Sequence, residues 1–302
     1  MTTKSTLKVA AAQYPIGQPK TLAEWEDKIA LWVKTGAATG AELLVFPEYA
    51  AIEQAAALGP DVYSDLKITL KRVAELAEDR VKFHAELAKT HKVHILVGSG
   101  PALKADGRYV NAAQMVTPAG RIGVQEKLVM TPFERDWGIS AGGPVRVFKT
   151  AIGTFGIAIC YDSEFPLLVR AMAEAGACVV LVPSCTERVS GYHRVRTGSQ
   201  ARALENTIAT VQSPTVGDAP WSPAVDFNAG SAGIYVPSEH GISDTGVLAE
   251  GHMNAAEWVS ATIDLARLKR IRETGEMHNF EDWTLQPGAP MSRVTVETVS
   301  LM

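Results

Sequence analysis

Short apolar segments of strand length alternate with longer amphipathic segments along most of the chain, and this alternation restricts the fold more than any other feature of the sequence. Apolar residues spaced three and four apart predict helices, whereas short runs rich in β-branched residues predict buried strands. Some neighbouring strands are separated only by turn residues, which indicates antiparallel hairpins. Hairpins within such a pattern favour an α/β (α+β) protein with mixed sheets covered by helices over an all-parallel, doubly wound sheet.

The predicted elements follow from these periods. Strands are expected at residues 7–12, 42–46, 93–98, 109–117, 121–127, 145–149, 153–160, 178–182, 206–212, 233–236, 247–249 and 258–263. Helices are expected at residues 22–38, 64–91, 167–175 and 192–205. The strands at 109–117 and 121–127 are expected to form one hairpin, and those at 247–249 and 258–263 a second hairpin that closes the domain.

We expect one domain, residues 1–264, followed by a C-terminal extension, residues 265–302. No low-complexity linker or sharp change in composition divides the first part. The extension carries Phe280 and Trp283. Because aromatic side chains gain free energy on burial, the extension is expected to pack on the body or on a partner subunit.

Composition excludes several classes of protein. The 302 residues are 46% hydrophobic and 21% charged, which suits a soluble protein with a large core. A net charge of −4 gives no electrostatic reason to expect nucleic acid or an anionic membrane as partner. The three cysteines are too few and too odd in number for a disulfide framework, and the N-terminus lacks the apolar segment of a signal peptide. We therefore expect a cytoplasmic protein that binds neither nucleic acid nor membrane.

Cys160 lies where the predicted strand at 153–160 gives way to a polar turn, and Pro166 then opens a helix. A thiol at such a place can serve as a nucleophile. Most free cysteines, however, are small buried hydrophobic residues. The turn alone leaves both interpretations open.

Two other segments also place charged residues at strand ends. Glu48 follows an apolar strand, and Lys127 ends another, with Glu134 seven residues further on. Taken singly, these are a solvated carboxylate and a surface charge pair. Together with Cys160 they supply a base, a cation and a nucleophile at carboxyl ends of strands, where layered α/β proteins bind ligands.

A thiol with a pKa of about 8.5 is only a few per cent ionised at pH 7, so forming the thiolate costs roughly 2 kcal/mol. A glutamate can accept its proton, and a lysine can stabilise the thiolate and then an oxyanion.

The segments Phe46–Glu48, Lys127 and Cys160–Asp162 resemble the Glu–Lys–Cys triad motifs of the nitrilase superfamily, the carbon–nitrogen hydrolases. The resemblance extends from Val9 to about Asp264 and includes the segment Gln200–Asn206. It implies a four-layer α-β-β-α sandwich that forms homodimers or higher homo-oligomers through its helices. It also implies catalysis without a metal or organic cofactor, and the sequence has no C-x-x-C, H-E-x-x-H or Walker motif.

The resemblance assigns roles to individual residues. Cys160 would be the nucleophile, Glu48 the general base, and Lys127 the group that stabilises the tetrahedral intermediate. Glu134 matches a second glutamate near the nucleophile, although Phe133 stands where the family commonly has glycine. The backbone N–H of Tyr161 would contribute to the oxyanion site. The implied reaction is hydrolysis of a small amide to an acid and ammonia through a thioester.

One position departs from the family pattern. Glu164 stands where many relatives carry an arginine, which the carbamoylase branch uses to bind a substrate carboxylate. We interpret this as a sign of a neutral or cationic substrate, or else of an internal ion pair between Glu164 and Arg170 or Arg188. Further candidates for the walls of the substrate pocket are Ser184, Arg188 and His193.

The sequence does not exclude several other functions. A nitrilase acting on a nitrile would share the triad, and an N-carbamoyl amine hydrolase is a third possibility that Glu164 disfavours. A papain-like pair of Cys160 and His193 has no supporting signature around the cysteine. A catalytically silent binding scaffold would not need Glu48, Lys127 and Cys160 together.

Overall fold

The computed structural model describes residues 4–286 and 295–302. Its strands form two sheets, which are joined through the end of β1. The first sheet has the order β12-β1-β2-β3-β4-β5, and the second has the order β13-β6-β7-β8-β9-β10-β11. The last two residues of β1 pair with β9 and so join the sheets. The strands of the first sheet are β1 (Thr6–Pro15), β2 (Leu43–Val45), β3 (His94–Leu103), β4 (Tyr109–Val116), β5 (Ile122–Glu126) and β12 (Glu257–Asp264). The strands of the second are β6 (Val145–Thr150), β7 (Gly153–Ile157), β8 (Val179–Ser184), β9 (Ala209–Val216), β10 (Gly233–Tyr235), β11 (Val247–Glu250) and β13 (Val296–Ser300).

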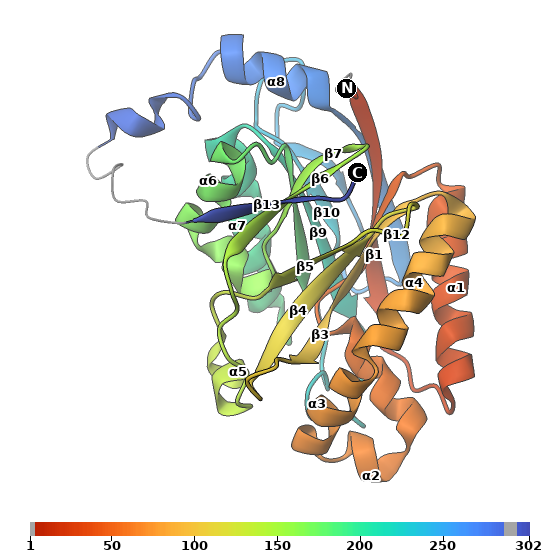
Figure 1. Ribbon diagram of the computed structural model, residues 1–302. Coiled ribbons are helices and arrows are strands. Elements are labelled where there is room, and N and C mark those ends of the chain that lie inside the picture. Colours follow the sequence, from red (N-terminus) through yellow and green to blue (C-terminus); the bar gives the residue numbers. More distant parts are fainter. Residues whose placement is uncertain (1–3, 287–294) are drawn as a thin grey trace.

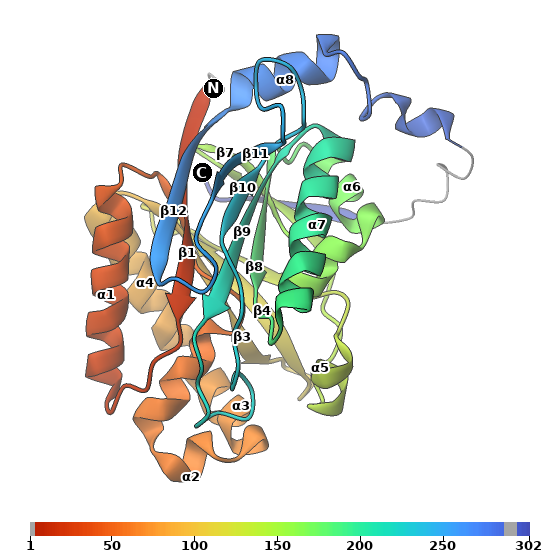
Figure 2. The same cartoon turned by 180° about the vertical axis from the view of Figure 1, so that it is seen from behind.

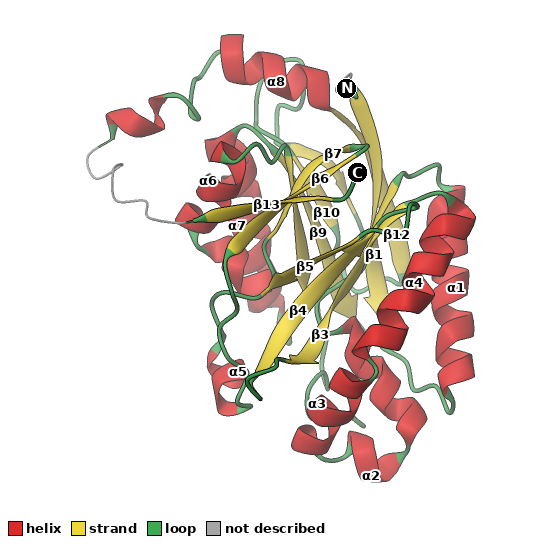
Figure 3. Ribbon diagram, in the orientation of Figure 1, coloured by secondary structure: helices red, strands yellow, loops and turns green. Residues whose placement is uncertain are grey.

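Helices cover the outer face of each sheet, so that the protein has four layers. Figures 1 and 2 show α1 and α4 on one side of the strands and α6 and α7 on the other, and Figure 3 shows the strands enclosed between them. The α-helices are α1 (Leu22–Ala38), α2 (Pro60–Tyr63), α3 (Leu66–Glu75), α4 (Ala77–His91), α5 (Pro132–Asp136), α6 (Pro166–Glu174), α7 (Val189–Asn206) and α8 (Leu265–Thr274). Short 3₁₀ helices are η1 (Ala50–Leu58), η2 (Cys160–Glu164) and η3 (Asp282–Leu285). The predicted α-β-β-α sandwich is confirmed.

Both sheets are mixed, as predicted. Strands β1, β2 and β3 run parallel, whereas β3, β4 and β5 are antiparallel neighbours. In the second sheet β7, β8 and β9 run parallel, and β6 is antiparallel to β7. The carboxyl ends of β2 and β7 therefore project from their sheets next to loops that can carry functional side chains.

The strands are apolar on both faces because each sheet lies between a helix layer and the other sheet. Alternate residues of β1 from Leu7 to Ala11 belong to the core between the sheets. The intervening residues from Ala10 to Tyr14 belong to the outer core, where they join Trp25 of α1. A strand buried on both sides has a continuous apolar sequence instead of an alternating one.

Most predicted elements are confirmed, but two helix ends differ. The helix expected at 64–91 is divided into α3 and α4 at Leu76, which caps both helices. Helix α7 continues to Asn206, so the strand predicted from residue 206 begins only at Ala209. Thr207 separates them with a φ of 50°, in the left-handed region that ends helices. Such a backbone angle in a threonine has no sequence signal.

The predicted closing hairpin is wrong. Strand β11 pairs with β10 in the second sheet, whereas β12 pairs along its whole length with β1 in the first. The Gln13 side chain donates hydrogen bonds to the carbonyls of His252 and Ala255, at 2.8 and 2.7 Å, and so fixes the crossover between the sheets. The long edge of β1 offers β12 more ladder hydrogen bonds than the four-residue β11 could.

The described parts of the C-terminal extension contact the body at three places. Helix α8 buries Leu265, Leu268 and Ile271. The Phe280 ring lies between two guanidinium groups, 4.2 Å from that of Arg170 and 3.9 Å from that of Arg272. Strand β13 pairs with β6. Residues 287–294 of the extension lie outside the described residues, and the division of the chain at residue 264 stays a prediction.

Within the described part of the chain, no helix has both the length and the apolar character that crossing a bilayer requires.

Candidate active site

Three strand ends bring Glu48, Lys127 and Cys160 together. Glu48 follows β2, Lys127 follows β5, and Cys160 opens η2 just after β7. The Lys127 Nζ lies 2.7 Å from Glu48 Oε1. The other oxygen of Glu48 accepts a 3.0 Å hydrogen bond from the backbone N–H of Cys185, and the carbonyl of Cys185 lies 3.8 Å from Cys160 Sγ. The residues predicted from three separate segments thus form one cluster.

Glu134 also belongs to this cluster. Its Oε2 lies 2.6 Å from Lys127 Nζ, so one ammonium group bridges two carboxylates, and all three side chains are at least 98% buried. The N-terminus of α5 fixes Glu134 through a capping box with Thr131. Buried charges are costly unless they are paired and hydrogen-bonded, and here each charge has several partners.

Sequence reasoning missed two side chains that complete the network. The Asn111 amide donates 3.0 Å hydrogen bonds to Oε1 of both Glu48 and Glu134. The Tyr49 hydroxyl donates to Glu134 Oε1 at 2.8 Å. A signal for Asn111 was present, because an asparagine within the apolar strand at 109–117 must have a buried partner. Tyr49 had no such signal beyond its position next to Glu48.

Their different environments shift the pKa values of Glu48 and Glu134 in opposite directions. Burial raises the pKa of Glu48, and the Lys127 ammonium only partly opposes this. Burial also acts to raise the pKa of Glu134, but Lys127 and the hydrogen-bond donors outweigh it and hold the pKa below its ordinary value. Burial favours neutral Lys127, yet the two carboxylates raise its pKa above the ordinary value. Glu48 is therefore the member of the cluster that accepts a proton most readily.

Cys160 is held in a strained and buried position. Its backbone φ is 48°, in the left-handed region that residues other than glycine rarely adopt, and its side chain is 5% exposed. Burial raises the pKa of the thiol well above its usual range, the Glu48 carboxylate raises it further, and Lys127 opposes both. The resting group is thus a thiol next to a carboxylate that can accept its proton.

Asp162 connects the Cys160 turn to the segment that carries Lys127. Its carboxylate accepts hydrogen bonds from the backbone N–H groups of Leu128 and Val129, at 3.1 and 2.8 Å. Burial raises the Asp162 pKa to about 7, although both donors favour the ionised form. Asp162 therefore fixes the turn that carries Cys160 relative to the segment that carries Lys127.

Helix α7 packs closely against the Cys160 turn at Gly198. A Cβ atom at this position would lie 3.0 Å from the carbonyl oxygen of Ser163, which also accepts a 3.0 Å hydrogen bond from Arg202. The Ser163 hydroxyl in turn donates to the Cys160 carbonyl at 2.6 Å. The position of Cys160 thus depends on a close approach of two backbones.

We expect Gly198→Ala to lower kcat about tenfold, because the Cys160 turn must move by a few tenths of an ångström and catalysis is sensitive to such displacements. The added methyl group should destabilise the fold by about 1 kcal/mol or more, which offsets the helix propensity that alanine gains. Steady-state kinetics together with thermal unfolding measures both effects. An unchanged kcat would show that this contact does not position the nucleophile.

The remaining predicted site residues lie apart from this cluster. The Ser184 hydroxyl is fully buried and donates to the Ser213 carbonyl at 3.4 Å. The Arg188 side chain is 79% exposed and its nearest carboxylate is that of the adjacent Glu187. Glu164 and His193 line an open groove of about 670 Å³ along α7. No described hydrogen bond or ion pair joins these four residues to the triad.

The ion pair predicted for Glu164 has a different partner. Glu164 lies 3.5 Å from Arg194 of α7, whereas Arg170 pairs with Glu174 one turn along α6. Helix α7 packs against η2 and places Arg194, not Arg170 or Arg188, beside Glu164. The charge at Glu164 is therefore partly balanced by an exposed arginine.

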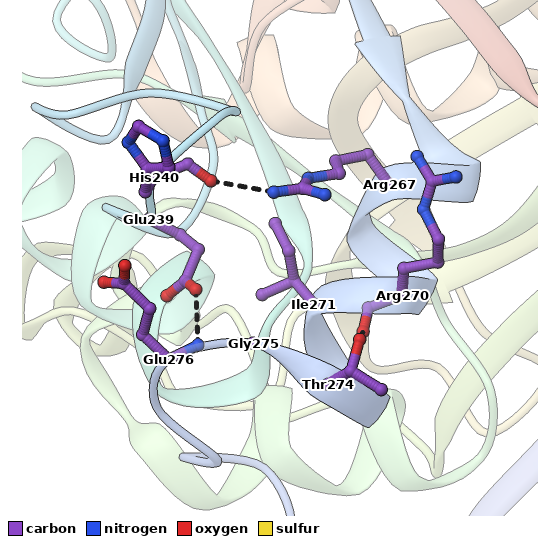
Figure 4. Close-up of a pocket in the computed structure, with 8 residues that line it drawn as sticks. All are labelled: Glu239, His240, Arg267, Arg270, Ile271, Thr274, Gly275 and Glu276. Carbon is purple, nitrogen blue, oxygen red and sulfur yellow. Dashed lines mark hydrogen bonds between the residues drawn. The ribbon is translucent and has the colours of Figure 1, made fainter.

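A second, smaller cavity of about 110 Å³ lies between α8 and the loop at 239–243 (Figure 4). Arg267 donates to the His240 carbonyl at 2.9 Å, and Glu239 accepts from the backbone of Glu276 at 2.6 Å. Its lining residues belong to α8 and the neighbouring loops and include none of the triad. Among the described residues, no three His, Cys, Asp or Glu side chains are placed to hold a metal ion.

Comparison with known proteins identifies the family of the chain. The sequence profile of the carbon-nitrogen hydrolase family matches residues 8–273. The chain is 35% identical over 277 residues to a probable hydrolase, YhcX, of Bacillus subtilis, which covers 91% of this chain and 53% of that protein. It is 28% identical over 225 residues to a deaminated glutathione amidase of Synechocystis sp., which covers 69% of this chain and 78% of the relative. The chain spans about half the length of several curated relatives that it matches.

A solved structure has the same fold. The crystal structure of Saccharomyces cerevisiae Nit3, a member of branch 10 of the nitrilase superfamily, superposes with a TM-score of 0.71 at 20% identity. The match covers 90% of this chain and 94% of Nit3. With a family profile that matches nearly the whole body, the chain belongs to the carbon–nitrogen hydrolase family.

Proposed function

We propose that the protein is an amidase that cleaves a small linear amide to an acid and ammonia through a thioester on Cys160. The observation that carries the proposal is the buried Lys127 bridging Glu48 and Glu134 beside the Cys160 thiol. A base, a fixed cation and a nucleophile are the groups that acyl transfer from an amide requires. The name of the Synechocystis relative, an amidase, supports the same reaction.

In the first half of the reaction Glu48 accepts the proton of the Cys160 thiol while sulfur attacks the carbonyl carbon. The new oxyanion is stabilised by Lys127 Nζ and by the backbone N–H of Tyr161. Protonated Glu48 then gives its proton to the leaving nitrogen, the C–N bond breaks, and ammonia departs. The acyl group stays on Cys160 as a thioester.

In the second half a water molecule attacks the thioester with Glu48 again as base. The tetrahedral intermediate collapses, the C–S bond breaks, and the acid leaves while the thiol regains its proton. Glu134 keeps Lys127 charged and in place throughout, because its low pKa holds it ionised. Asn111 and Tyr49 fix both carboxylates in position.

The acid side of the pH profile should report Glu48. Because burial raises the pKa of Glu48, the carboxylate takes up a proton, and stops acting as base, at a higher pH than a glutamate with the ordinary pKa of 4.5 would. We expect kcat/KM to fall as pH decreases through this raised pKa while the protein stays folded. Rates measured from pH 4 to 9, with circular dichroism at each pH, test this. An acid limb at or below pH 4.5 would contradict the role of Glu48 as base.

A panel of substrates tests the reaction type. Ammonia release is measured for matched amides, nitriles and N-carbamoyl amines that share one acyl group. The proposal predicts the highest kcat/KM for the amides. A preference for nitriles would identify a nitrilase instead, a preference for carbamoyl amines an N-carbamoyl amine hydrolase, and the absence of any turnover would favour a silent binding scaffold.

The same panel tests the substrate charge suggested by Glu164. Neutral and cationic amides are expected to react faster than monoamides of dicarboxylic acids. Because Arg194 already faces Glu164, the preference should be modest, about 1 kcal/mol or less. A clear preference for dicarboxylate monoamides would exclude the neutral or cationic interpretation.

We also propose that the protein is a cytoplasmic homodimer or higher homo-oligomer that associates through α6 and α7. These helices expose large apolar side chains, namely Leu167, Val189 and Leu204. Burial of such side chains at a subunit interface would favour association. Light scattering coupled to size-exclusion chromatography measures the oligomeric state, and a monomer at micromolar concentration would refute the proposal.

A further inference from the structure

A second cysteine, which the proposed mechanism does not use, lies beside the nucleophile. Strands β7 and β8 are parallel neighbours, with Ile157 opposite Leu181. Cys160 lies three residues beyond the first of these and Cys185 four residues beyond the second, so the two cysteines end adjacent strands. Both residues lie beyond the last paired residues of β7 and β8, and the two strands bring these segments side by side. A disulfide requires Cα atoms about 4.4–6.8 Å apart.

The contacts of the two residues agree with this placement. The Cys160 Sγ atom lies 3.8 Å from the carbonyl oxygen of Cys185. The Cys185 thiol is half-buried, and its one described hydrogen-bond partner is Asn228 Oδ1, at 3.4 Å. A thiol is a weak hydrogen-bond donor, so breaking this contact costs little free energy.

Both thiols lie in the field of the same carboxylate. Glu48 acts to raise the pKa of Cys160, and after burial it is the largest cause that raises the pKa of Cys185 to about 12. Glu48 also accepts the backbone N–H of Cys185. A carboxylate in this place can take a proton from either thiol, which both steps of disulfide formation require.

We infer that Cys160 and Cys185 form a reversible disulfide when a hydroperoxide oxidises Cys160. In the first step the Cys160 sulfur, having given its proton to Glu48, attacks the peroxide; the O–O bond breaks, sulfur is oxidised to a sulfenic acid, and the peroxide is reduced to water or an alcohol. In the second step the Cys185 sulfur attacks the sulfenic sulfur, an S–S bond forms, and water leaves. A dithiol reduces the disulfide and restores both thiols.

This modification has two consequences. The disulfide blocks the nucleophile, so turnover stops while it is present. It also protects Cys160, because a sulfenic acid that meets no second thiol can be oxidised further to sulfinic and sulfonic acids, which a dithiol does not reduce. The inference rests on the proposed role of Cys160 as the reactive thiol.

Cys178 provides a matched control within the same strand. It immediately precedes β8, whereas Cys185 immediately follows it, and the intervening residues separate the two by roughly 20 Å. Its thiol contacts the Thr154 carbonyl at 3.3 Å, at the other end of the sheet from Cys160. Cys178→Ser therefore removes a thiol without removing the partner of Cys160.

The test treats the wild type, Cys178→Ser and Cys185→Ser with hydrogen peroxide. Amide turnover is measured before treatment, after it, and after dithiothreitol, and is normalised to each protein's own starting rate. Peptides are identified by mass spectrometry without reduction. The wild type and Cys178→Ser are expected to show a peptide linked between Cys160 and Cys185 and to recover most activity. Cys185→Ser should recover about fivefold less and carry sulfinic and sulfonic acid on Cys160.

Two results would overturn the inference, and they are distinguishable. If wild-type Cys160 proceeds to sulfinic acid with no linked peptide, the disulfide is excluded while the nucleophile assignment stands. If Cys160 stays unmodified, whether or not activity is lost, Cys160 is not the thiol that peroxide oxidises and the inference fails; the proposed function fails as well only if Cys160→Ala also keeps its amide turnover. The linked peptide is sought in the unaltered protein, so the test does not depend on the folding of a variant.

Discussion

Replacing Cys160 with alanine is expected to abolish ammonia release, with kcat reduced by about 10⁴-fold or more. Among the described side chains next to the cluster, the only other thiol is that of Cys185, whose sulfur hydrogen-bonds Asn228 Oδ1 at 3.4 Å. The fold should persist, because a thiol is a weak hydrogen-bond donor and its described contact with the Cys185 carbonyl is 3.8 Å long. Thermal unfolding and far-UV circular dichroism verify this.

Cys178→Ala is the matched control for that variant. It also removes a thiol that is largely withdrawn from solvent, and it should retain activity close to that of the wild type. The comparison separates loss of chemistry from loss of packing. Turnover by Cys160→Ala within tenfold of the wild-type rate would mean that Cys160 is not the nucleophile.

Replacing Lys127 with methionine should reduce kcat by about 10²–10⁴-fold and also destabilise the fold. Activity falls because the oxyanion loses its fixed cation. Stability falls by about 3–5 kcal/mol because Glu48 and Glu134 are left buried without their common partner. Lys104→Met is the control, since that lysine pairs with Glu126 in a more exposed position and should cost about 1 kcal/mol or less.

The pH dependence of this variant has a definite sign. Without the ammonium group, the two buried carboxyls have folded-state pKa values above those of the unfolded chain, so the folded protein binds more protons. Its stability therefore decreases as pH rises through that interval. The free energy of unfolding of Lys127→Met should therefore lie closer to that of the wild type at pH 5 than at pH 8. Chemical denaturation at both pH values measures it, and an equal deficit would contradict the account.

A double variant separates stability from catalysis. Adding Glu134→Gln to Lys127→Met removes one of the unpaired carboxylates, and it should recover part of the lost stability. It should recover no activity, because the cation is still missing. If the double variant regains turnover, Lys127 acts only by holding the fold together.

Glu48, Lys127 and Cys160 could be predicted from sequence because each lies within three residues of a strand end. Apolar runs locate the strand ends, and the charged or nucleophilic residue comes soon after, as for Lys127 next to β5. Asn111 could also have been found, because a polar residue inside a buried strand must be satisfied. By contrast, the hydrogen bond from the Cys185 backbone N–H to Glu48 could not be predicted, because a backbone donor does not depend on the type of side chain.

Pairing between distant segments was harder to predict than the elements themselves. Strand β12 was located correctly, but its partner is β1, from the opposite end of the chain. The choice depends on the Gln13 side chain and on the available edge of β1, neither of which local periodicity describes. The predicted partners of Glu164, Arg170 and Arg188, were wrong for the same reason. The packing of α7 on η2 places Arg194 next to Glu164 instead.

Residues that the sequence analysis did not identify hold the segment after Glu48 in place. Helix η1 follows Glu48 directly, and two of its adjacent residues are fixed in place by buried polar contacts. Glu53 accepts hydrogen bonds from Tyr14 and Lys28, and Gln54 accepts one from Arg80 at 2.6 Å. These contacts join η1 to β1, α1 and α4, so the position of the base depends on three distant elements.

The most direct test of the central claim is detection of the acyl group on Cys160 during one turnover. Enzyme and a slowly hydrolysed amide are mixed at equal concentrations and quenched with acid at successive times. Ammonia is measured, and the peptide that contains Cys160 is analysed by mass spectrometry. The account predicts an acyl adduct on Cys160 that forms together with ammonia and disappears as the acid product forms. Release of one equivalent of ammonia while Cys160 stays unmodified and the acyl group is found on another residue would contradict it.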